Sequence, residues 1–249
     1  MCKDSIGWGA LVSMMSVLMA RNGFTGITPL FSEAPEADWI LGLGRDWQIL
    51  QLYFKPYTAC RWAQPAVDGA LHIQRKFKLE VADIRSIRIR SFKAACALSC
   101  RPPANTEEAQ YNMAFPVAAA LVDGKVGPAQ VLPPRIFDST ILNVLARIST
   151  EIDDVIEAEF PAKTFAEVIV ETTDGRQLYS GRMEPRWEPP DTLPTDRELE
   201  TKFIWLTAPV LGDIASRKLM DFIWQINDSD RISDLIAMCC PNKPMDGFR

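Results

Sequence analysis

The chain has 249 residues, enough for one large domain or two small ones. Apolar residues make up 47% of it and charged residues 24%, which are the proportions of a globular protein with a sizeable core. The formal net charge of −5 and the pI near 5.1 argue against a nucleic-acid binder, because such a protein presents a basic surface. We therefore expect no nucleic-acid partner.

The six cysteines are spread over the chain, and none of them forms a C-x-x-C pair. With His72 as the sole histidine, this spacing argues against a structural zinc, and the cysteine density is too low for a disulfide scaffold. The pair Gly42 and Gly44 lacks the third glycine of a dinucleotide fingerprint. We expect reduced thiols, a cytoplasmic location, and no cofactor or metal.

The first predicted element is a helix from about residue 6 to residue 22, with Asp4 or Ser5 as its N-cap. The segment 21–23 (Arg-Asn-Gly) is typical of a helix C-terminus. Residues 6–20 are too short to span a bilayer, and the acidic Asp4 and the missing cleavage site argue against a signal peptide, so we expect no membrane association. Because the helix is apolar all round, it needs cover from a downstream bundle or from another polypeptide.

The predicted α/β part follows a turn-rich stretch and a short helix or loop around residues 37–43. A strand over 48–54 is indicated by alternating apolar residues, and Pro65 favours a helix over 65–77. The basic alternation of residues 85–90 predicts a strand over 84–92 with a possible bulge and one solvated arginine face.

The remaining elements are also predicted from periodicity and caps. A helix capped at Asn105 or Thr106 should run to about Val122, with Pro116 either kinking it or marking a restart, and Asp174-Gly175 favours a tight hairpin. The other expected elements are helices over 139–148, 197–207, 214–226 and 232–238, and strands over 150–155, 166–171 and 177–179. The Pro-rich acidic stretch 186–194 is predicted to be a linker. The order indicates an α+β fold in which an α/β subdomain is inserted between segments of a larger helical layer.

The stretch 54–62 combines Lys55 and Arg61 with aromatic residues and the thiol of Cys60. Cations at a strand-to-helix junction favour an anion site, because a helix N-terminus presents free N–H groups and positive partial charge. The alternative is a surface loop whose aromatic side chains close the core.

Several segments together resemble the MmgE/PrpD family, which includes 2-methylcitrate dehydratases, cis-aconitate decarboxylases and iminodisuccinate epimerases. The segments that carry the resemblance are 23–26 (GFTG), 54–57 (FKPY) with 60–62 (CRW) and 65–68 (PAVD), 108–111 (EAQY) with 118–124 (AAALVDG), 173–176 (TDGR), and Lys202-Phe203 with Leu206. Their order and spacing match only the C-terminal half of the family's members.

The resemblance implies a large helical domain, built from both chain ends, and a smaller α/β lid domain. Residues 1–47 would then be the end of the first helical portion, 48–188 the lid and 189–249 the returning helices. The front half of the helical domain would come from a separate polypeptide or from another subunit.

The family's chemistry implies proton abstraction next to a carboxylate, followed by loss of water or CO₂ or by return of the proton to the other face. Such chemistry needs an acid and base beside the carbon and cations that hold the carboxylates. By resemblance, Lys55 and Cys60 are the catalytic candidates, and Tyr57, Arg61, Gln64 and Phe115 are the substrate-binding candidates. Phe115 takes a position at which the family often has a hydroxyl-bearing aromatic, and Gln64 takes one at which many members have His.

Three hypotheses follow for the function. The first is half of a split isomerase or lyase (an epimerase, dehydratase or decarboxylase) acting on a small carboxylate or another acidic-carbon substrate, completed by a partner polypeptide as a heterodimer or by a homo-oligomer. The second is a non-catalytic truncated homologue that stabilises or regulates a full-length relative. The third is a fragment without function. Fold-level analogy alone does not decide among them.

Overall fold

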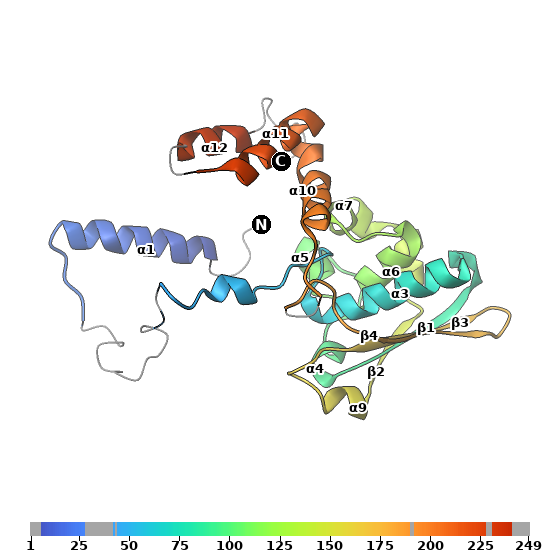
Figure 1. Cartoon of the computed structure of the whole chain (residues 1–249). Coiled ribbons are helices and arrows are strands. Elements are labelled where there is room, and N and C mark those ends of the chain that lie inside the picture. The colour runs from blue at the N-terminus through green and yellow to red at the C-terminus, as the bar shows by residue number, and fades with distance from the viewer. Residues whose placement is uncertain (1–5, 28–41, 43, 190–191, 228–230, 241–249) are drawn as a thin grey trace. The chain divides into compact units, whose positions relative to one another are not determined.

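The computed structural model describes residues 6–27, 42, 44–189, 192–227 and 231–240 (Figure 1). The chain divides into two units, residues 1–50 and residues 51–249. Most of the predicted short helix or loop around residues 37–43 lies outside the described residues. Within the described part of the chain, no helix is both long enough and apolar enough to cross a bilayer.

The first unit contains the predicted N-terminal helix, α1 (Ile6–Arg21). It ends as expected, with Arg21 in its last turn and Gly23 in the left-handed region at φ 85°. Its apolar side chains are exposed all round in this unit, including Trp8 at 66% and Val12 at 61%. A helix with this surface is stable only where another apolar surface covers it.

The second unit is built on a mixed sheet of four strands within the described residues: β1 (Ile84–Ser91), β2 (Ile148–Ile152), β3 (Ala166–Thr172) and β4 (Gln177–Met183). The spatial order is β2-β1-β3-β4, with β1 and β2 parallel and the other pairs antiparallel. The fold is therefore α+β, as predicted. The predicted bulge in β1 is confirmed, because the pairing with β3 shifts between Ile84 and Ser86.

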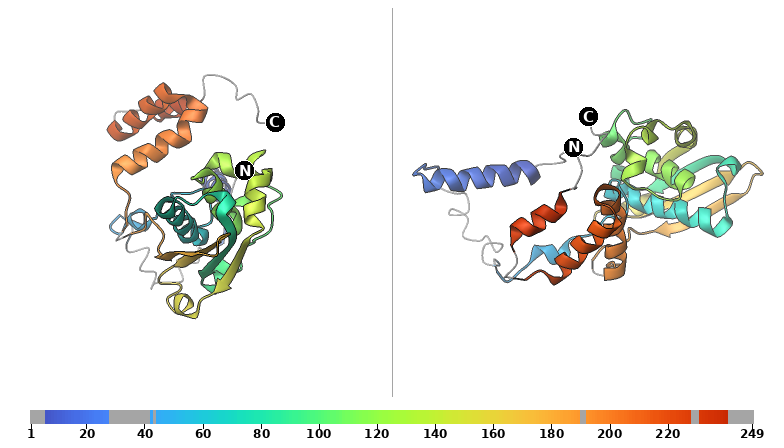
Figure 2. Two further views of the ribbon diagram at one scale, coloured as in Figure 1. Left: turned by 90° about the vertical axis from the view of Figure 1, so that its right-hand side faces the viewer. Right: turned by 90° about the horizontal axis from the view of Figure 1, so that it is seen from above.

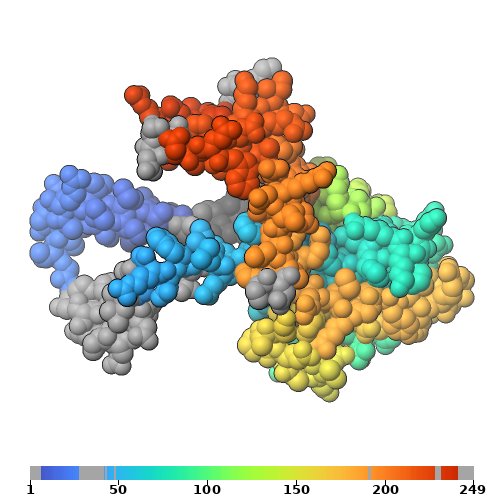
Figure 3. Space-filling model, in the orientation of Figure 1, coloured from blue at the N-terminus to red at the C-terminus, as the bar shows by residue number. Residues whose placement is uncertain are grey.

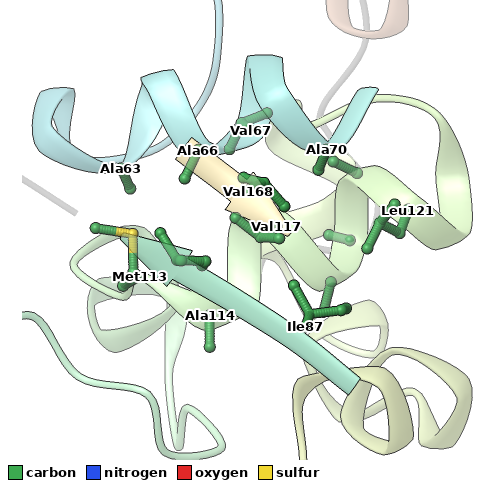
Figure 4. Close-up of a cluster of buried hydrophobic side chains, with 14 of the residues drawn as sticks. Ala63, Ala66, Val67, Ala70, Ile87, Met113, Ala114, Val117, Leu121 and Val168 are labelled. Atoms are coloured by element: carbon green, nitrogen blue, oxygen red, sulfur yellow. The ribbon is translucent and has the colours of Figure 1, made fainter. Parts of the chain in front are cut away.

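Two helices, α3 (Gln64–Phe77) and α6 (Ala114–Asp123), provide the helical side of the core. Figure 4 shows side chains of α3, such as Val67, directed toward Val117 of α6 and Val168 of β3. Both helices contribute buried alanines to this interface, two from α3 and four from α6. Small side chains let the helices approach each other and the sheet closely, which produces a continuous apolar core.

The opposite face of β1 carries the predicted row of arginines. Arg85 pairs with Glu171 of β3, Arg88 with Glu151 of β2, and Arg90 with both Glu167 of β3 and Asp153. The prediction of a solvated arginine face is confirmed. These cations are matched by carboxylates on the neighbouring strands, which is the stabilising arrangement for charged cross-strand pairs.

The predicted helix from Asn105 to Val122 is two helices, α5 (Thr106–Gln110) and α6. The Asn105 side chain caps α5 by accepting a hydrogen bond from Glu108 N, as predicted. Of the two expectations for Pro116, the restart is observed, two residues earlier than Pro116 itself: α6 begins at Ala114, and Pro116 falls in its first turn. A proline there lacks only an N–H group that has no intrahelical partner.

The predicted strand over residues 48–54 is also wrong. Residues Gln48–Gln51 form a 3-10 helix, η2, and Leu50 is 75% exposed. Alternating apolar residues form a strand only where a neighbouring strand accepts their hydrogen bonds, and none of the described strands pairs with this segment.

The short elements connect the sheet and the larger helices. They are η3 (Arg61–Ala63), η4 (Val81–Asp83), α4 (Lys93–Cys96), α7 (Pro128–Val131), η5 (Arg135–Phe137), α8 (Ser139–Leu145) and α9 (Asp154–Glu157). The strand predicted over residues 150–155 is observed as β2, Ile148–Ile152. It ends before residue 155 because Asp153 is the N-cap of α9.

The three predicted C-terminal helices are confirmed as α10 (Asp196–Leu211), α11 (Asp213–Gln225) and α12 (Ile232–Cys239). Successive helices of this set pack on each other, and both views of Figure 2 show them grouped together in orange and red. Thr195 and Glu198 form a capping box at the start of α10.

Candidate functional site

The basic-aromatic stretch 54–62 is a fixed loop. Phe54 N donates to the carbonyl of Trp187 (3.0 Å), Thr58 N to that of Val126 (3.2 Å) and Cys60 N to that of Gln110 (2.7 Å). The loop is therefore attached to three segments that lie far apart in the sequence. Its ends are held before any ligand binds.

Tyr57, Asp68 and Arg186 form a hydrogen-bonded network at the centre of this loop. The Tyr57 hydroxyl donates to Asp68 Oδ1 (2.6 Å), Arg186 Nε donates to the same oxygen (2.9 Å), and Arg186 Nη2 donates to the Tyr57 oxygen (2.6 Å). Asp68 comes from α3 and is only 8% exposed. The network therefore joins the loop, a core helix and the predicted linker after β4.

Burial is the main cause of the shifted pKa values of Asp68 and Tyr57 in this network. It raises the pKa of Asp68 despite the Tyr57 hydrogen bond and the Arg186 charge, because Asp68 Oδ2 is buried without a hydrogen-bond partner. Burial and the adjacent carboxylate also raise the pKa of Tyr57. Tyr57 is therefore a neutral hydrogen-bond donor at physiological pH.

We expect Tyr57→Phe to lower the free energy of unfolding by about 1–3 kcal/mol, because it removes the hydroxyl donor from a buried carboxylate. It should also raise the pKa of Asp68 further, since the lost hydrogen bond favours the charged form. A raised carboxyl pKa makes the folded state bind more protons than the unfolded state, so stability falls as pH rises from the ordinary carboxyl pKa to the folded one.

Urea unfolding of Tyr57→Phe and wild type at neutral pH and at about pH 4 measures this effect. The difference in the free energy of unfolding between wild type and Tyr57→Phe should be smaller at about pH 4 than at neutral pH. Tyr179→Phe is the matched control, because Tyr179 is exposed and, among the described residues, its hydroxyl bonds Gln177 on the same strand. An equal loss of unfolding free energy in Tyr57→Phe and Tyr179→Phe would contradict the prediction.

Arg61 is already paired in the structure. Its Nη2 lies 2.7 Å from Glu188 Oε2 and its Nε contacts Glu188 Oε1, while its guanidinium lies 4.9 Å from the ring centroid of Tyr53. The Glu188 hydrogen bonds raise the pKa of Arg61. Arg61 thus attaches the linker to the loop, and it would have to exchange partners to bind a substrate.

The other sequence-predicted residues differ in their access to solvent. Cys60 is a free, half-buried thiol. Gln64 is buried and its amide donates to the carbonyl of Ala59 (3.3 Å). Phe115 is fully buried in the hydrophobic core. His72, the sole histidine, is exposed on α3.

Lys55 is exposed and lies next to Lys202 of α10, a residue not singled out for the site from the sequence. Lys202 Nζ donates to the Lys55 carbonyl oxygen and lies 5.8 Å from the ring centroid of Trp187. Burial, followed by the charge of Lys55, lowers the pKa of Lys202. Among the described residues, neither lysine forms an ion pair with a carboxylate.

A pocket of about 400 Å³ opens beside this pair of lysines. It is lined by Pro56 of the loop, by Arg186 and Trp187 after β4, and by the first turns of α10 as far as Trp205. In Figure 3, the segment around α10 (orange) lies against the α/β block. The pocket is concave, carries several cations and has aromatic walls, which are properties of a small-molecule site.

The sequence missed Asp68, Arg186, Glu188 and Lys202 as site residues. Lys202 lies in one of the segments that carry the family resemblance, so a signal for it was present. Arg186 and Glu188 lie in the stretch predicted to be a linker, where charged residues are expected in any case. Their partners are more than 110 residues away, at separations of 118 for Arg186 to Asp68 and 127 for Arg61 to Glu188.

The family profile of the MmgE/PrpD C-terminal domain matches residues 57–227. The chain belongs to the MmgE/PrpD family. The matched range covers the loop from Tyr57, the whole sheet, and α10 and α11, so this MmgE/PrpD chain contains the network of Tyr57 and the pocket beside Lys202 inside the family domain. Lys55 lies two residues before the match. No curated protein matches the chain at a significant level.

Proposed function

We propose that this MmgE/PrpD chain is the carboxylate-binding half of an isomerase or lyase. It acts by proton abstraction next to a carboxylate or carbonyl, which leads to epimerisation, dehydration or decarboxylation. Membership of the family supports the reaction class. The two neighbouring lysines of the site, Lys55 and Lys202, support the role of this chain in binding the carboxylate of the substrate.

The observation that carries the proposal is the position of Lys55 next to Lys202. Lys202 Nζ donates a hydrogen bond to the Lys55 carbonyl oxygen, and burial, followed by repulsion from the charge of Lys55, lowers the pKa of Lys202. Within the described residues no carboxylate offsets their charge. A bound carboxylate would relieve the repulsion and would be held by charge-assisted hydrogen bonds.

In the proposed reaction, Lys55 binds the carboxylate and stabilises the negative charge that develops on it when the adjacent C–H proton leaves. In this proposal Cys60, which lies on the same loop, exchanges a proton with the substrate. Tyr57 stays protonated and donates a hydrogen bond. Arg61 supports the loop through Glu188, while Gln64 and Phe115 act from the core by fixing the shape of α3 and α6.

The general base comes from a helical partner polypeptide or from a second copy of the chain. Helices α1 and α10 to α12 support this part of the proposal, because they present exposed apolar residues in their own units, among them Trp8, Ile214 and Trp224. Helix surfaces of this kind are covered by further helices in helical domains. The arrangement would make the α/β part a lid on a larger helical domain.

A non-catalytic role as a stabiliser or regulator of a full-length relative is the second candidate. It is favoured by the position of Phe115 and Gln64 in the core and by the exposure of His72, which leave few proton-transfer groups at the loop. The two candidates differ in one measurable property, since only the enzyme exchanges the proton next to a carboxylate.

The test is proton exchange in D₂O, followed by NMR on candidate acids, with the chain co-purified with its native partner. We expect Lys55→Ala to lower the exchange rate by about 10²–10³-fold without changing assembly, because an electrostatic contact to the developing charge is lost. Lys218→Ala, an exposed lysine on α11, is the control. Unchanged exchange in Lys55→Ala would refute the site, and no exchange by the wild-type assembly would favour the regulatory role.

A further inference from the structure

The pocket beside Lys202 has an excess of positive charge. Of its cations, Arg186 is neutralised by Asp68, and the one lining carboxylate, Glu198, is engaged at the start of α10, where it accepts hydrogen bonds from Thr195 N and Oγ1 (both 2.9 Å). Lys202 and Arg197 have no ion pair among the described residues. With Arg186 paired to Asp68, the two cations Arg197 and Lys202 still outnumber the one lining carboxylate, so the pocket is cationic on balance and a ligand that occupies it carries an anionic group.

The same pocket has aromatic walls. Trp187 and Trp205 both line it. The Trp187 backbone is in the left-handed region at φ 67°, and its carbonyl oxygen is held by Phe54 N. That backbone conformation is sterically unfavourable for a tryptophan, so contacts with the surrounding residues must hold Trp187 in it. Its ring already faces cations, with Arg186 and Lys202 each 5.8 Å from its centroid.

Flat aromatic walls next to unpaired cations suit a ligand with two parts. A carboxylate satisfies the cations, and a flat apolar ring buries itself along the indoles, since aromatic pairs in offset or edge contacts are stabilising. A hydrophilic polycarboxylate would satisfy the charge but would leave the aromatic walls without an apolar partner. The pocket volume of about 400 Å³ is sufficient for a single ring with a short acid side chain.

We propose that this pocket binds an organic acid whose carboxylate is joined through a short side chain to a flat apolar ring, with the carboxylate at Lys202 and Arg197 and the ring along Trp187 and Trp205. The proposal names the substrate class of the site described above and rests on the proposed function for the fate of that ligand. Binding itself requires no turnover. Lys202 is in this view a specificity-determining residue.

The experiment is isothermal titration calorimetry of the full chain with phenylacetate, phenylacetamide and citrate as probes. We expect phenylacetate to bind with a Kd of about 1 mM or lower and the uncharged amide and citrate to bind at least about tenfold more weakly. Lys202→Met should weaken phenylacetate binding about tenfold, and Lys202→Arg should restore most of it because the charge is kept. Lys218→Met on α11 is the control and should bind as wild type does.

Equal binding of acid and amide, tighter binding of citrate, or unchanged affinity in Lys202→Met would each overturn the proposal. Unfolding curves of the variants separate loss of binding from loss of the fold. The proton-exchange assay separates this proposal from the proposed function. If phenylacetate binds but the assembled protein exchanges no proton next to a carboxylate, the proposed reaction is refuted and the substrate class stands. If other acids exchange their protons and phenylacetate does not bind, the substrate class is refuted and the proposed reaction stands.

Discussion

Gly69→Ala is expected to destabilise the α/β unit by about 1–3 kcal/mol, although alanine is the better helix former. Gly69 lies in α3 where the helix crosses the sheet. An added Cβ would lie 2.9 Å from Val168 Cγ2 and 3.1 Å from Ser180 Oγ. Neither atom can move freely, because Val168 is fully buried and Ser180 Oγ accepts a hydrogen bond from Val168 N (2.9 Å) at an irregularity in the β3–β4 pairing.

Chemical denaturation followed by circular dichroism measures this loss. Gly9→Ala is the matched control, since Gly9 is also helical and an added Cβ there meets nothing within 4 Å. We expect the control to leave the unfolding of the second unit unchanged. A stabilised Gly69→Ala protein would show that helix propensity outweighs the contact with β3.

Gly127→Ala is expected to release the start of α10 from the α/β block. The added Cβ would overlap ring atoms Cζ2 and Cη2 of Trp205, so the indole has to leave the surface of Gly127. Trp205 is 36% exposed, so part of its ring is covered by this contact, which attaches α10 to the α/β block together with the hydrogen bond of Lys202 to the Lys55 carbonyl. Since Trp205 also lines the pocket beside Lys202, phenylacetate affinity should fall at least about tenfold.

Hydrogen exchange and tryptophan fluorescence report the release. Amides of α10 should exchange faster and the emission should shift to the red, while amides of β1 and β3 stay protected. Gly26→Ala, where an added Cβ meets nothing within 4 Å, is the control. The double variant Gly127→Ala with Trp205→Leu should recover part of the stability, and strict additivity of the two changes would contradict a direct contact.

Much of the fold follows from local sequence signals. Strand β1 has period-two alternation, α5 starts at the Asn105 cap, and α10 starts at the capping box of Thr195 with Glu198. Each signal acts within one or two turns of chain, so it is readable without any tertiary contact. The strand predicted over residues 48–54 is wrong for the opposite reason, because a strand requires a neighbouring strand, and no local sequence pattern indicates whether one is present.

The candidate site was predicted only in part. Lys55, Tyr57 and Cys60 were singled out because they lie together in one short stretch, and the family profile, which starts at Tyr57, confirms the family resemblance itself. Phe115 shows the limit of this approach. It was singled out by resemblance as a substrate-binding candidate, but its apolar side chain is fully buried in the hydrophobic core.

The sequence by itself determined the family, the α+β class, the two-cation loop and most of the helices, because these depend on short-range patterns and on ordered motifs. Only the tertiary structure decided the strand order, the part-buried hydrogen bond of Arg186 to Asp68 across 118 positions, and the approach of Lys202 to Lys55 across 147. Charges that meet over such separations are brought together by the packing of the core. Their pairing depends on burial and geometry, for which the linear order of residues contains no local signal.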